Sequence, residues 1–464
     1  MRVRTRHWAV LWLPVCCALV ATFASPVLAA EDGALPLHLT IEKAVELALS
    51  HNEAIRIADE GVNEAKGTYT EYAADAFPQI KGVINYSRYF ERMYADVDMT
   101  ALNPILEQFD APPMKKEKQY FNSQHEWDFR LMAEQNIFTF GKVSNAIRLG
   151  STFQKIAKES KKITVKDVVL QTRQTFLQVL FLKESLKVAQ SNLELVQETH
   201  GVVSAKAKQG VMSRFELLIV ESELAAAKPS LLRAKRDLQT ATQALLNVIG
   251  EPLDREVTVV GELEFTKLES DFPAMIRQAK LQRPELRLLK LQGEMFDRSY
   301  KISRAFYLPT LSANATYAQT GGTDKQIWPE DPEDEFQPTL SFGVQLYVPL
   351  FDGLRAYGKM KQMAAKRHTA RLQHAQATRG IELEVTSLTN QIQTTEDIFT
   401  ANLTAVEVTE EAHRLAQLRF ENGLGTRLEV TDARNTLNRA KLGLAATLFD
   451  LNVNRARLKR ALGQ

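Results

Sequence analysis

Apolar residues follow a helical period over two long stretches of the chain, residues 141–209 and 354–422. In the first stretch an apolar residue recurs every seven positions, at Leu149, Ile156, Ile163, Leu170 and Leu177. A seven-residue period predicts left-handed coiled packing against a neighbouring helix. At a rise of about 1.5 Å per residue, each stretch predicts a continuous helix of about 100 Å.

Each long stretch ends in a glycine-containing turn, and a second helical stretch follows it. The turns are Gly210-Val211-Met212-Ser213 and Gly423-Leu424-Gly425-Thr426, and the helices after them are expected at residues 213–249 and 426–462. Corresponding positions of the two turns differ by 213 in the numbering, and so do the closing glycines Gly250 and Gly463. A constant offset over segments of this length predicts a structural duplication.

Four shorter runs alternate apolar and polar residues, which is the weak signature of membrane-spanning strands or of ordinary half-buried hairpins. They lie at about residues 80–90, 127–134, 311–317 and 340–348. Two runs precede each long helix, and polar loops at about residues 91–124 and 320–337 connect the members of each pair. The runs alone leave both interpretations open.

A further helix is expected before each pair of strands, at about residues 40–76 and 275–306. Each ends at a proline-containing turn, Phe77-Pro78-Gln79-Ile80 in the first copy and Leu308-Pro309-Thr310-Leu311 in the second, because a residue before proline avoids the helical region. These turns differ by 231 in the numbering. This offset exceeds 213 by 18, which predicts an insertion of that length in one of the loops.

The N-terminus has the pattern of a secretory signal peptide, which we place at residues 1–30. A basic start precedes an apolar run at residues 8–21, and Ala29-Ala30 offers a cleavage site. Both cysteines, Cys16 and Cys17, fall in this segment. Whether either is lipidated is left open, although the better site at Ala29-Ala30 favours plain cleavage. The mature chain would then contain no disulfide.

The remaining chain divides into a first repeat at residues 31–250, a linker at 251–270 and a second repeat at 271–464. The linker contains the strand-like run Val257-Thr258-Val259-Val260. No later segment offers an apolar run of about 18 residues, so no transmembrane helix is expected. The formal charge is +2, and loss of three arginines with the signal leaves about −1, which gives no reason to expect nucleic acid binding.

Four strands cannot close a barrel, and an open sheet edge is not tolerated in lipid. If the strands enter a membrane, the chain must therefore assemble. Two copies would supply eight strands and an interior filled by side chains, whereas three copies would supply twelve strands and room for a lumen. Helices of about 100 Å could then cross a periplasm.

This order of elements resembles the TolC family of outer-membrane efflux and secretion channels. The resemblance covers nearly all of the mature chain. It rests on Leu308-Pro309-Thr310-Leu311, on Val348-Pro349-Leu350-Phe351-Asp352-Gly353 and on the spacing of Phe420, Gly423, Thr426, Glu429, Asp432 and Ala433. It implies a mainly helical fold with a membrane β-barrel. In that fold a homotrimer combines four strands per chain into a twelve-stranded barrel, which stands on an α-helical barrel of long antiparallel helices.

The resemblance also implies a function. Such proteins are exit ducts for efflux or type I secretion that lie in outer-membrane lipid and extend into the periplasm. They dock with a periplasmic adaptor (a membrane fusion protein) and with an inner-membrane transporter, whose class and cargo the sequence does not reveal. The alternative is a soluble periplasmic coiled-coil scaffold or adaptor, which needs no alternating strands. A passive uptake porin is disfavoured because it would devote most of its length to strands.

The two glycine-containing turns are the first candidate site. Ser213 and Thr426 begin capping-box sequences that are completed by Glu216 and Glu429, a standard way to start a helix. By resemblance, the turns at residues 210–213 and 423–426 would instead form the periplasmic tip that contacts the adaptor.

Two acidic residues form the second candidate site. Glu429 and Asp432 share a helix face, and by resemblance they align with acidic positions that line the closed entrance of the family. Three copies would set about six carboxylates in a ring, which would bind cations and disfavour anions. A solvated helix surface is the alternative. Where the family often has an arginine, this chain has Gly425, and Arg427 is the candidate to replace it in bonds between protomers.

Aromatic residues on the strands form the third candidate site. Trp127 lies at a strand end, where it could join a belt at the membrane interface with Tyr86 and Tyr347, and with Tyr89 and Tyr317. Packing within a hairpin is the alternative. No zinc-binding His-Glu-x-x-His, phosphate loop or nucleophile elbow occurs in the chain. We therefore expect no cofactor, no metal site and no enzymatic activity.

Overall fold

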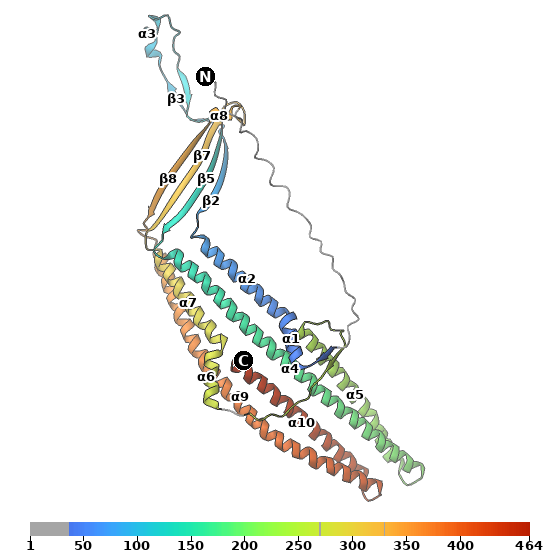
Figure 1. The fold of residues 1–464 in the computed structure, drawn as a ribbon. Coiled ribbons are helices and arrows are strands. Elements are labelled where there is room, and N and C mark those ends of the chain that lie inside the picture. Colours follow the sequence, from blue (N-terminus) through green and yellow to red (C-terminus); the bar gives the residue numbers. More distant parts are fainter. Residues whose placement is uncertain (1–36, 269–270, 329) are drawn as a thin grey trace, which may run out of the picture.

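The computed structural model describes residues 37–268, 271–328 and 330–464. The predicted signal peptide, with Cys16 and Cys17, lies outside the described residues. The molecule is elongated, with a four-stranded sheet near one end and two helical hairpins at the other (Figure 1). None of the described helices has an apolar stretch long enough to cross a membrane.

Two long helices dominate the structure, as the sequence predicts. α4 covers Lys142–Lys208 and α9 covers Arg355–Glu421. Each turns back into a shorter helix, α5 at Arg214–Ile249 and α10 at Arg427–Ala461. The α4–α5 hairpin and the α9–α10 hairpin lie side by side, with α4 against α10.

The helices that precede the strands differ from the prediction, because each is broken in two. Their bounds are Ile41–His51 for α1, Glu53–Ala74 for α2, Phe272–Gln282 for α6 and Pro284–Ala305 for α7. The breaks fall at Asn52 and Arg283, which share the offset of 231 that relates the two proline-containing turns. The break therefore belongs to the repeat.

The two breaks have different chemical causes. Asn52 has an extended ψ of 126°, and its side chain accepts a hydrogen bond from the Ala54 amide, which caps a new helix. Arg283 has a ψ of 121° because the following Pro284 excludes the helical conformation. The prediction missed both because the apolar period continues across them.

The four predicted strands are confirmed and form one antiparallel sheet in the order β2-β5-β7-β8. Their bounds are Gln79–Arg88 for β2, His125–Phe138 for β5, Thr310–Thr323 for β7 and Phe336–Tyr347 for β8. β2 and β8 are the edges, and no strand in the described part of the chain pairs with their outer sides.

This sheet has one apolar face and one polar face. The register aligns Tyr86 with Trp127, and Ile84 with Phe129, so these side chains share a face. The same face continues toward the helices with Leu131, Ala133, Tyr317, Leu340, Phe342 and Val344. The opposite face carries Asn85, Asp128, Arg130, Thr316, Thr320, Gln337 and Ser341. In one chain the apolar face is uncovered: Phe342 is 78% exposed.

The connecting segments hold short elements that were not predicted. The loop at 91–124 contains β3 (Tyr94–Val97), η1 (Thr100–Leu102), α3 (Asn103–Glu107) and β4 (Glu117–Tyr120), and the loop before β8 contains α8 (Pro332–Glu335). The strand-like run of the linker is confirmed as β6 (Val257–Val259), and its parallel partner is β1 (Leu37–Leu39).

Two hydrophobic cores lie where the shorter helices meet the long ones, one in each copy. The first core includes Ala48, Ile55, Val168, Val179, Leu245 and Ile249. The second includes the residues at the corresponding positions: Ala279, Leu286, Ile381, Ile392, Leu458 and Leu462. The two copies therefore bury corresponding positions, as a structural duplication predicts.

Gly250 provides a test of this packing. It closes α5 with a left-handed φ of +73°, and a Cβ there would lie 2.8 Å from the His51 carbonyl oxygen. Gly210 has a φ of +79° but open space around it. Gly210→Ala should therefore destabilise the protein by only about 1–2 kcal/mol, the cost of an alanine in the left-handed conformation. Gly250→Ala adds a steric clash with His51 to that cost, so it should lower the melting temperature more than Gly210→Ala does.

Thermal unfolding in detergent, followed by circular dichroism, measures this difference. Gly201→Ala is the control, because Gly201 lies within α4 with nothing near its Cβ position. Equal melting temperatures for Gly250→Ala and Gly210→Ala would contradict the close approach of α1 to the end of α5.

Candidate functional site at the hairpin tips

The two tip turns use the same backbone chemistry in both copies. Gly210 and Gly423 have left-handed φ values of +79° and +73°, which end the long helices. The hydroxyls of Ser213 and Thr426 then accept hydrogen bonds from the amides of Glu216 and Glu429, at 3.2 and 3.3 Å. The helix-capping interpretation of these residues is therefore confirmed.

Both tips also expose apolar side chains at corresponding positions. Val211 and Leu424 are 73% and 74% exposed, and Phe215 and Leu428 are 69% and 68% exposed. Both pairs share the repeat offset of 213 in the numbering, so the duplication presents the same apolar surface twice. Apolar side chains exposed at the end of a molecule are typical of a protein–protein contact. Met212 is partly buried and packs against the small core beneath the turns.

That core joins the two hairpins. Val203 and Val220 of the first copy are buried against Phe420 and Val430 of the second. The Lys206 ammonium donates to the Phe420 carbonyl oxygen at 3.1 Å. The first copy therefore supplies a cation to the C-terminal carbonyl groups of α9, where the helix dipole favours positive charge.

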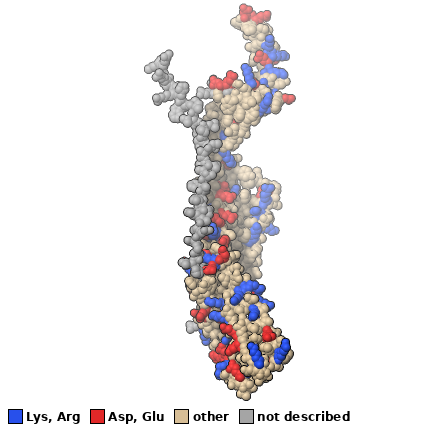
Figure 2. All heavy atoms as spheres, turned by 90° about the vertical axis from the view of Figure 1, so that its right-hand side faces the viewer, with Lys and Arg blue, Asp and Glu red and all other residues tan. Residues whose placement is uncertain are grey.

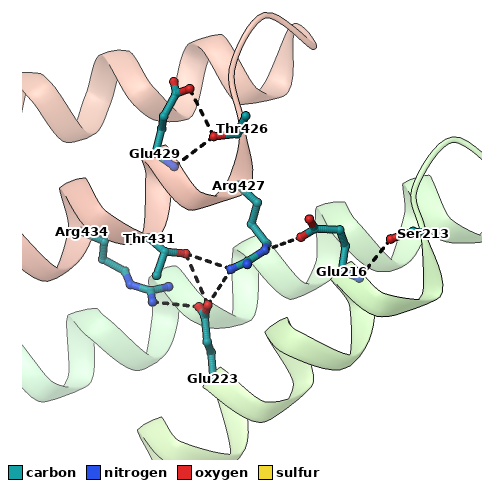
Figure 3. A network of polar contacts seen from close by, with 8 residues as sticks. All are labelled: Ser213, Glu216, Glu223, Thr426, Arg427, Glu429, Thr431 and Arg434. Carbon is teal, nitrogen blue, oxygen red and sulfur yellow. Dashed lines mark hydrogen bonds and ion pairs between the residues drawn. The ribbon is translucent and has the colours of Figure 1, made fainter.

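A buried arginine completes the connection (Figure 3). Arg427, whose side chain is 9% exposed, lies 2.5 Å from the carboxylate of Glu216 and 2.7 Å from that of Glu223. Arg434 approaches the other oxygen of Glu223 at 2.9 Å. The network joins α10 of the second copy to α5 of the first. Both partners of Arg427 lie in the same chain, and a role of this residue in bonds between protomers stays a prediction.

The two predicted entrance acids lie outside this network. Glu429 and Asp432 are both exposed on α10. The Glu429 carboxylate is 3.9 Å from the Arg419 Nε, a long and exposed pair. The Glu429 carboxylate also accepts a hydrogen bond from the Thr426 hydroxyl of the same chain at 3.2 Å (Figure 3), whereas Asp432 forms no salt bridge with the described residues.

The aromatic residues of the sheet form a cluster at its loop end. The rings of Tyr86 and Trp127 have centroids 4.7 Å apart, and Trp127 stacks on Phe129 at 5.8 Å. Trp328 packs edge-on to Trp127, whose ring N–H donates to the Ile327 carbonyl oxygen at 2.7 Å. The prediction missed Trp328 because it lies in a loop without a period.

Tyr347 does not belong to this cluster. It pairs with Thr310 at the helix end of the sheet, and the register places it on the polar face. Tyr347 therefore lies at the opposite end of the sheet from Trp127 and Tyr86, and the assignment of these three residues to membrane interfaces stays a prediction. Tyr317 lies on the apolar face, opposite Leu131 and Leu340.

Comparison with known proteins now decides the family. The sequence matches the family described as outer membrane efflux protein over residues 44–251 and 275–464, which is most of the chain. The chain belongs to the outer membrane efflux protein family.

Curated relatives of this efflux protein are consistent with that assignment. It is 26% identical to the pyoverdine export outer membrane protein OpmQ of Pseudomonas putida over 272 residues, which are 58% of this chain and 55% of that protein. It is 20% identical to the outer membrane protein TolC of Escherichia coli over 72% of this chain and 68% of TolC. The expected resemblance to the TolC family is confirmed.

Solved structures show the same fold. The outer membrane channel CmeC of Campylobacter jejuni superposes with a TM-score of 0.75 at 15% identity, over 91% of this efflux protein and 85% of CmeC. These relatives are channel proteins rather than enzymes. The efflux protein is located in the outer membrane and extends into the periplasm, which disfavours the soluble scaffold and the uptake porin.

Charge substitution tests the Arg427 network of the efflux protein. Arg427→Ala leaves the Glu216 carboxylate without its partner. We expect the free energy of local unfolding at the tip to fall by about 2 kcal/mol, which lies between the values for exposed and for fully buried ion pairs. Hydrogen exchange of residues 203–223 should accelerate accordingly. Arg419→Ala is the control, because its exposed pair with Glu429 should contribute less than about 1 kcal/mol. Equal effects would contradict the structural role of Arg427.

The protonation of His413 provides a second test. Burial lowers the pKa of this imidazole, and the positive charges of Arg434 and Lys441 lower it further. A depressed pKa means that the neutral ring stabilises the fold fully above the ordinary value of about 6.5, and that this contribution is lost as the pH falls below it. Tip amides should therefore exchange faster at pH 5.5 than at pH 7.5 after correction for intrinsic rates. His413→Gln should remove most of that difference, and an unchanged difference would contradict this assignment.

Proposed function

We propose that three copies of this chain close a twelve-stranded barrel in the outer membrane and form one continuous exit duct for efflux or type I secretion. The observation that carries this proposal is the sheet itself. It has an exposed apolar face, a polar face and two edges without partners among the described residues.

The apolar face would contact lipid, and the polar face would line the lumen. Unpaired backbone groups cost several kcal/mol each in lipid, so the outer edges of β2 and β8 require partners. If β8 of one copy pairs with β2 of the next, every edge is removed. Eight strands from two copies would enclose side chains only, whereas twelve leave a lumen. The cluster around Trp127 and Trp328 would then lie at one membrane interface.

At the other end, the tip turns would contact a periplasmic adaptor, which connects the duct to an inner-membrane transporter. The exposed Val211 and Phe215, with Leu424 and Leu428, support this assignment. Three copies would present six such tips of nearly equal chemistry. Gly210, Ser213, Gly423, Gly425 and Thr426 would shape the turns that carry these side chains.

We place the entrance of the duct at Glu429 and Asp432. Both carboxylates are exposed in a single chain, three positions apart on α10 and close to the tip. A ring from three copies would concentrate negative charge at a narrow opening, where divalent cations bind most strongly.

Conductance in planar bilayers tests this placement. The double variant Glu429→Ala with Asp432→Ala should weaken block by divalent cations applied from the tip side by about tenfold, the equivalent of about 1.4 kcal/mol. Asp450→Ala is the matched control, because Asp450 is an exposed acid farther along α10. Unchanged block in the double variant would remove these residues from the entrance. A wild-type protein that never conducts would contradict the channel itself.

A further inference from the structure

A small cavity lined by cations lies where the C-terminal end of α10 packs against α4. The cavity has a volume of about 230 Å³. None of the described residues in its wall is acidic, whereas four are basic: Lys166, Arg173, Lys459 and Arg460. The rest of the wall consists of Val169, Leu170, Ala456 and Gln464. A concave site with charges of one sign in its wall concentrates ions of the opposite sign, so this cavity is suited to an anion.

One of these four cations already has carboxylate partners. The Arg460 guanidinium lies 2.8 Å from the Asp167 carboxylate and 3.0 Å from that of Glu285. The other three cations form no ion pair with a described carboxylate, and the main-chain carboxyl group of Gln464 forms none with them. Three positive charges therefore line one small cavity without a negative partner in the described part of the chain.

The first repeat supplies two of the three uncompensated cations. Lys166 and Arg173 are seven residues apart on α4, which is two helical turns, so they lie on the same side of the helix. The Lys166 ammonium donates to the Gly463 carbonyl oxygen at 2.6 Å, which holds it at the end of α10. The Nε atom of Arg173 is buried and has no hydrogen-bond partner among the described residues. A buried donor without a partner indicates a bound water or ion.

Helix capping explains only part of this positive charge. Lys459 and Arg460 lie in the last turn of α10, where the helix dipole and the free carbonyl groups favour cations. Lys166 serves the same end of α10 through its bond to Gly463. Arg173 lies two turns farther along α4 and forms no ion pair in the part of the chain that the structure describes. Capping therefore leaves Arg173 unexplained.

The duplication shows that the packing of the helices does not require four cations. The positions that lie 213 residues away carry Arg379 and Thr386 on α9, and Leu246 and Asn247 on α5. One of those four positions is basic, whereas all four are basic at the cavity. The cationic cluster is therefore a property of this one contact between α4 and α10 and not of the repeat.

We propose that this cavity binds a phosphate group, held by Lys166, Arg173 and Lys459. Guanidinium and ammonium groups both bind phosphate oxygens, and three uncompensated charges suit a multivalent anion better than a single carboxylate. The bound anion would contact both repeats and would hold α4 of the first against α10 of the second. All of its ligands belong to one chain, so the site does not depend on the proposed trimer.

A second cavity adjoins the first and shares Arg173 and Lys459 with it. It has a volume of about 430 Å³. Apolar side chains form much of its wall: Ile41, Leu177, Leu268, Met275, Leu458 and Leu462. Two sources of the phosphate group fit this arrangement, namely inorganic phosphate and a molecule whose phosphate group carries an alkyl chain. The chemistry at the three cations is the same for both.

Isothermal titration calorimetry of the full chain in a neutral detergent tests the site. In chloride buffer of constant ionic strength, inorganic phosphate should bind once per chain. The double variant Arg173→Gln with Lys459→Gln should bind it at least tenfold more weakly. Arg457→Gln is the matched control, because Arg457 is an exposed cation on the same turn of α10 that lines neither cavity. An equal loss of affinity in the control and the double variant would overturn the site.

Hexyl phosphate distinguishes the two sources. Equal or weaker binding of hexyl phosphate than of inorganic phosphate assigns the site to the free anion. Tighter binding assigns it to an alkyl phosphate whose chain occupies the second cavity. Hexanol is the control for the apolar contribution, and binding of hexanol as tight as that of hexyl phosphate would overturn the role of the cations. Absence of saturable binding for both phosphates would overturn the proposal as a whole and would leave the proposed channel standing.

Thermal unfolding separates a ligand site from a purely structural role of the cations. A ligand that binds only the folded chain raises its melting temperature. Phosphate should therefore raise the melting temperature of the wild type and of Arg457→Gln, but not that of the double variant. In chloride alone the double variant should be at least as stable as the wild type, because it has lost repulsion between like charges. A destabilised double variant that phosphate still stabilises fully would show that the cations serve only the packing of α10 on α4, and would overturn the site.

Discussion

Backbone hydrogen bonding constrains this molecule more than any other interaction. Its sheet has four strands, and the outer groups of β2 and β8 have no partner in the described chain. Water can satisfy such groups, but hydrocarbon cannot. The apolar face of the same sheet, with Leu340, Phe342 and Val344 largely exposed, is equally unsuited to water. Association with further copies in the membrane would satisfy both requirements, because it would pair the edge strands and place the apolar face against lipid.

The duplication makes such association possible. The two repeats bury corresponding core residues and end in corresponding turns, so three chains would present six nearly equivalent units. Within one chain the two repeats are connected at several places. α4 packs against α7, and at the tips Arg427 forms ion pairs with Glu216 and Glu223. Figure 2 shows basic and acidic side chains gathered over the helical part of the molecule.

Much of the fold follows from the sequence because its signals are local and long. The helices α4 and α9 repeat their apolar pattern many times, and the alternation in β8 is nearly complete. The capping residues Ser213 and Thr426 were predictable because the signal lies within four consecutive residues. The breaks at Asn52 and Arg283 were not, since a single residue interrupts a period that continues on both sides.

Contacts between distant parts of the chain could not be predicted from the sequence. The carboxylate partners of Arg427 belong to the other repeat, and no local pattern connects them to the arginine. Trp328 was missed because its partners are set by the path of a loop.

Amide hydrogen exchange of the sheet, measured with the protein in a lipid bilayer, tests the central claim most directly. If neighbouring copies close the sheet, the outward amides of β2 and β8 should exchange as slowly as those of the inner strands β5 and β7. Fast exchange at both edges, with slow exchange in β5 and β7, would show that the sheet stays open in the membrane and would contradict the account.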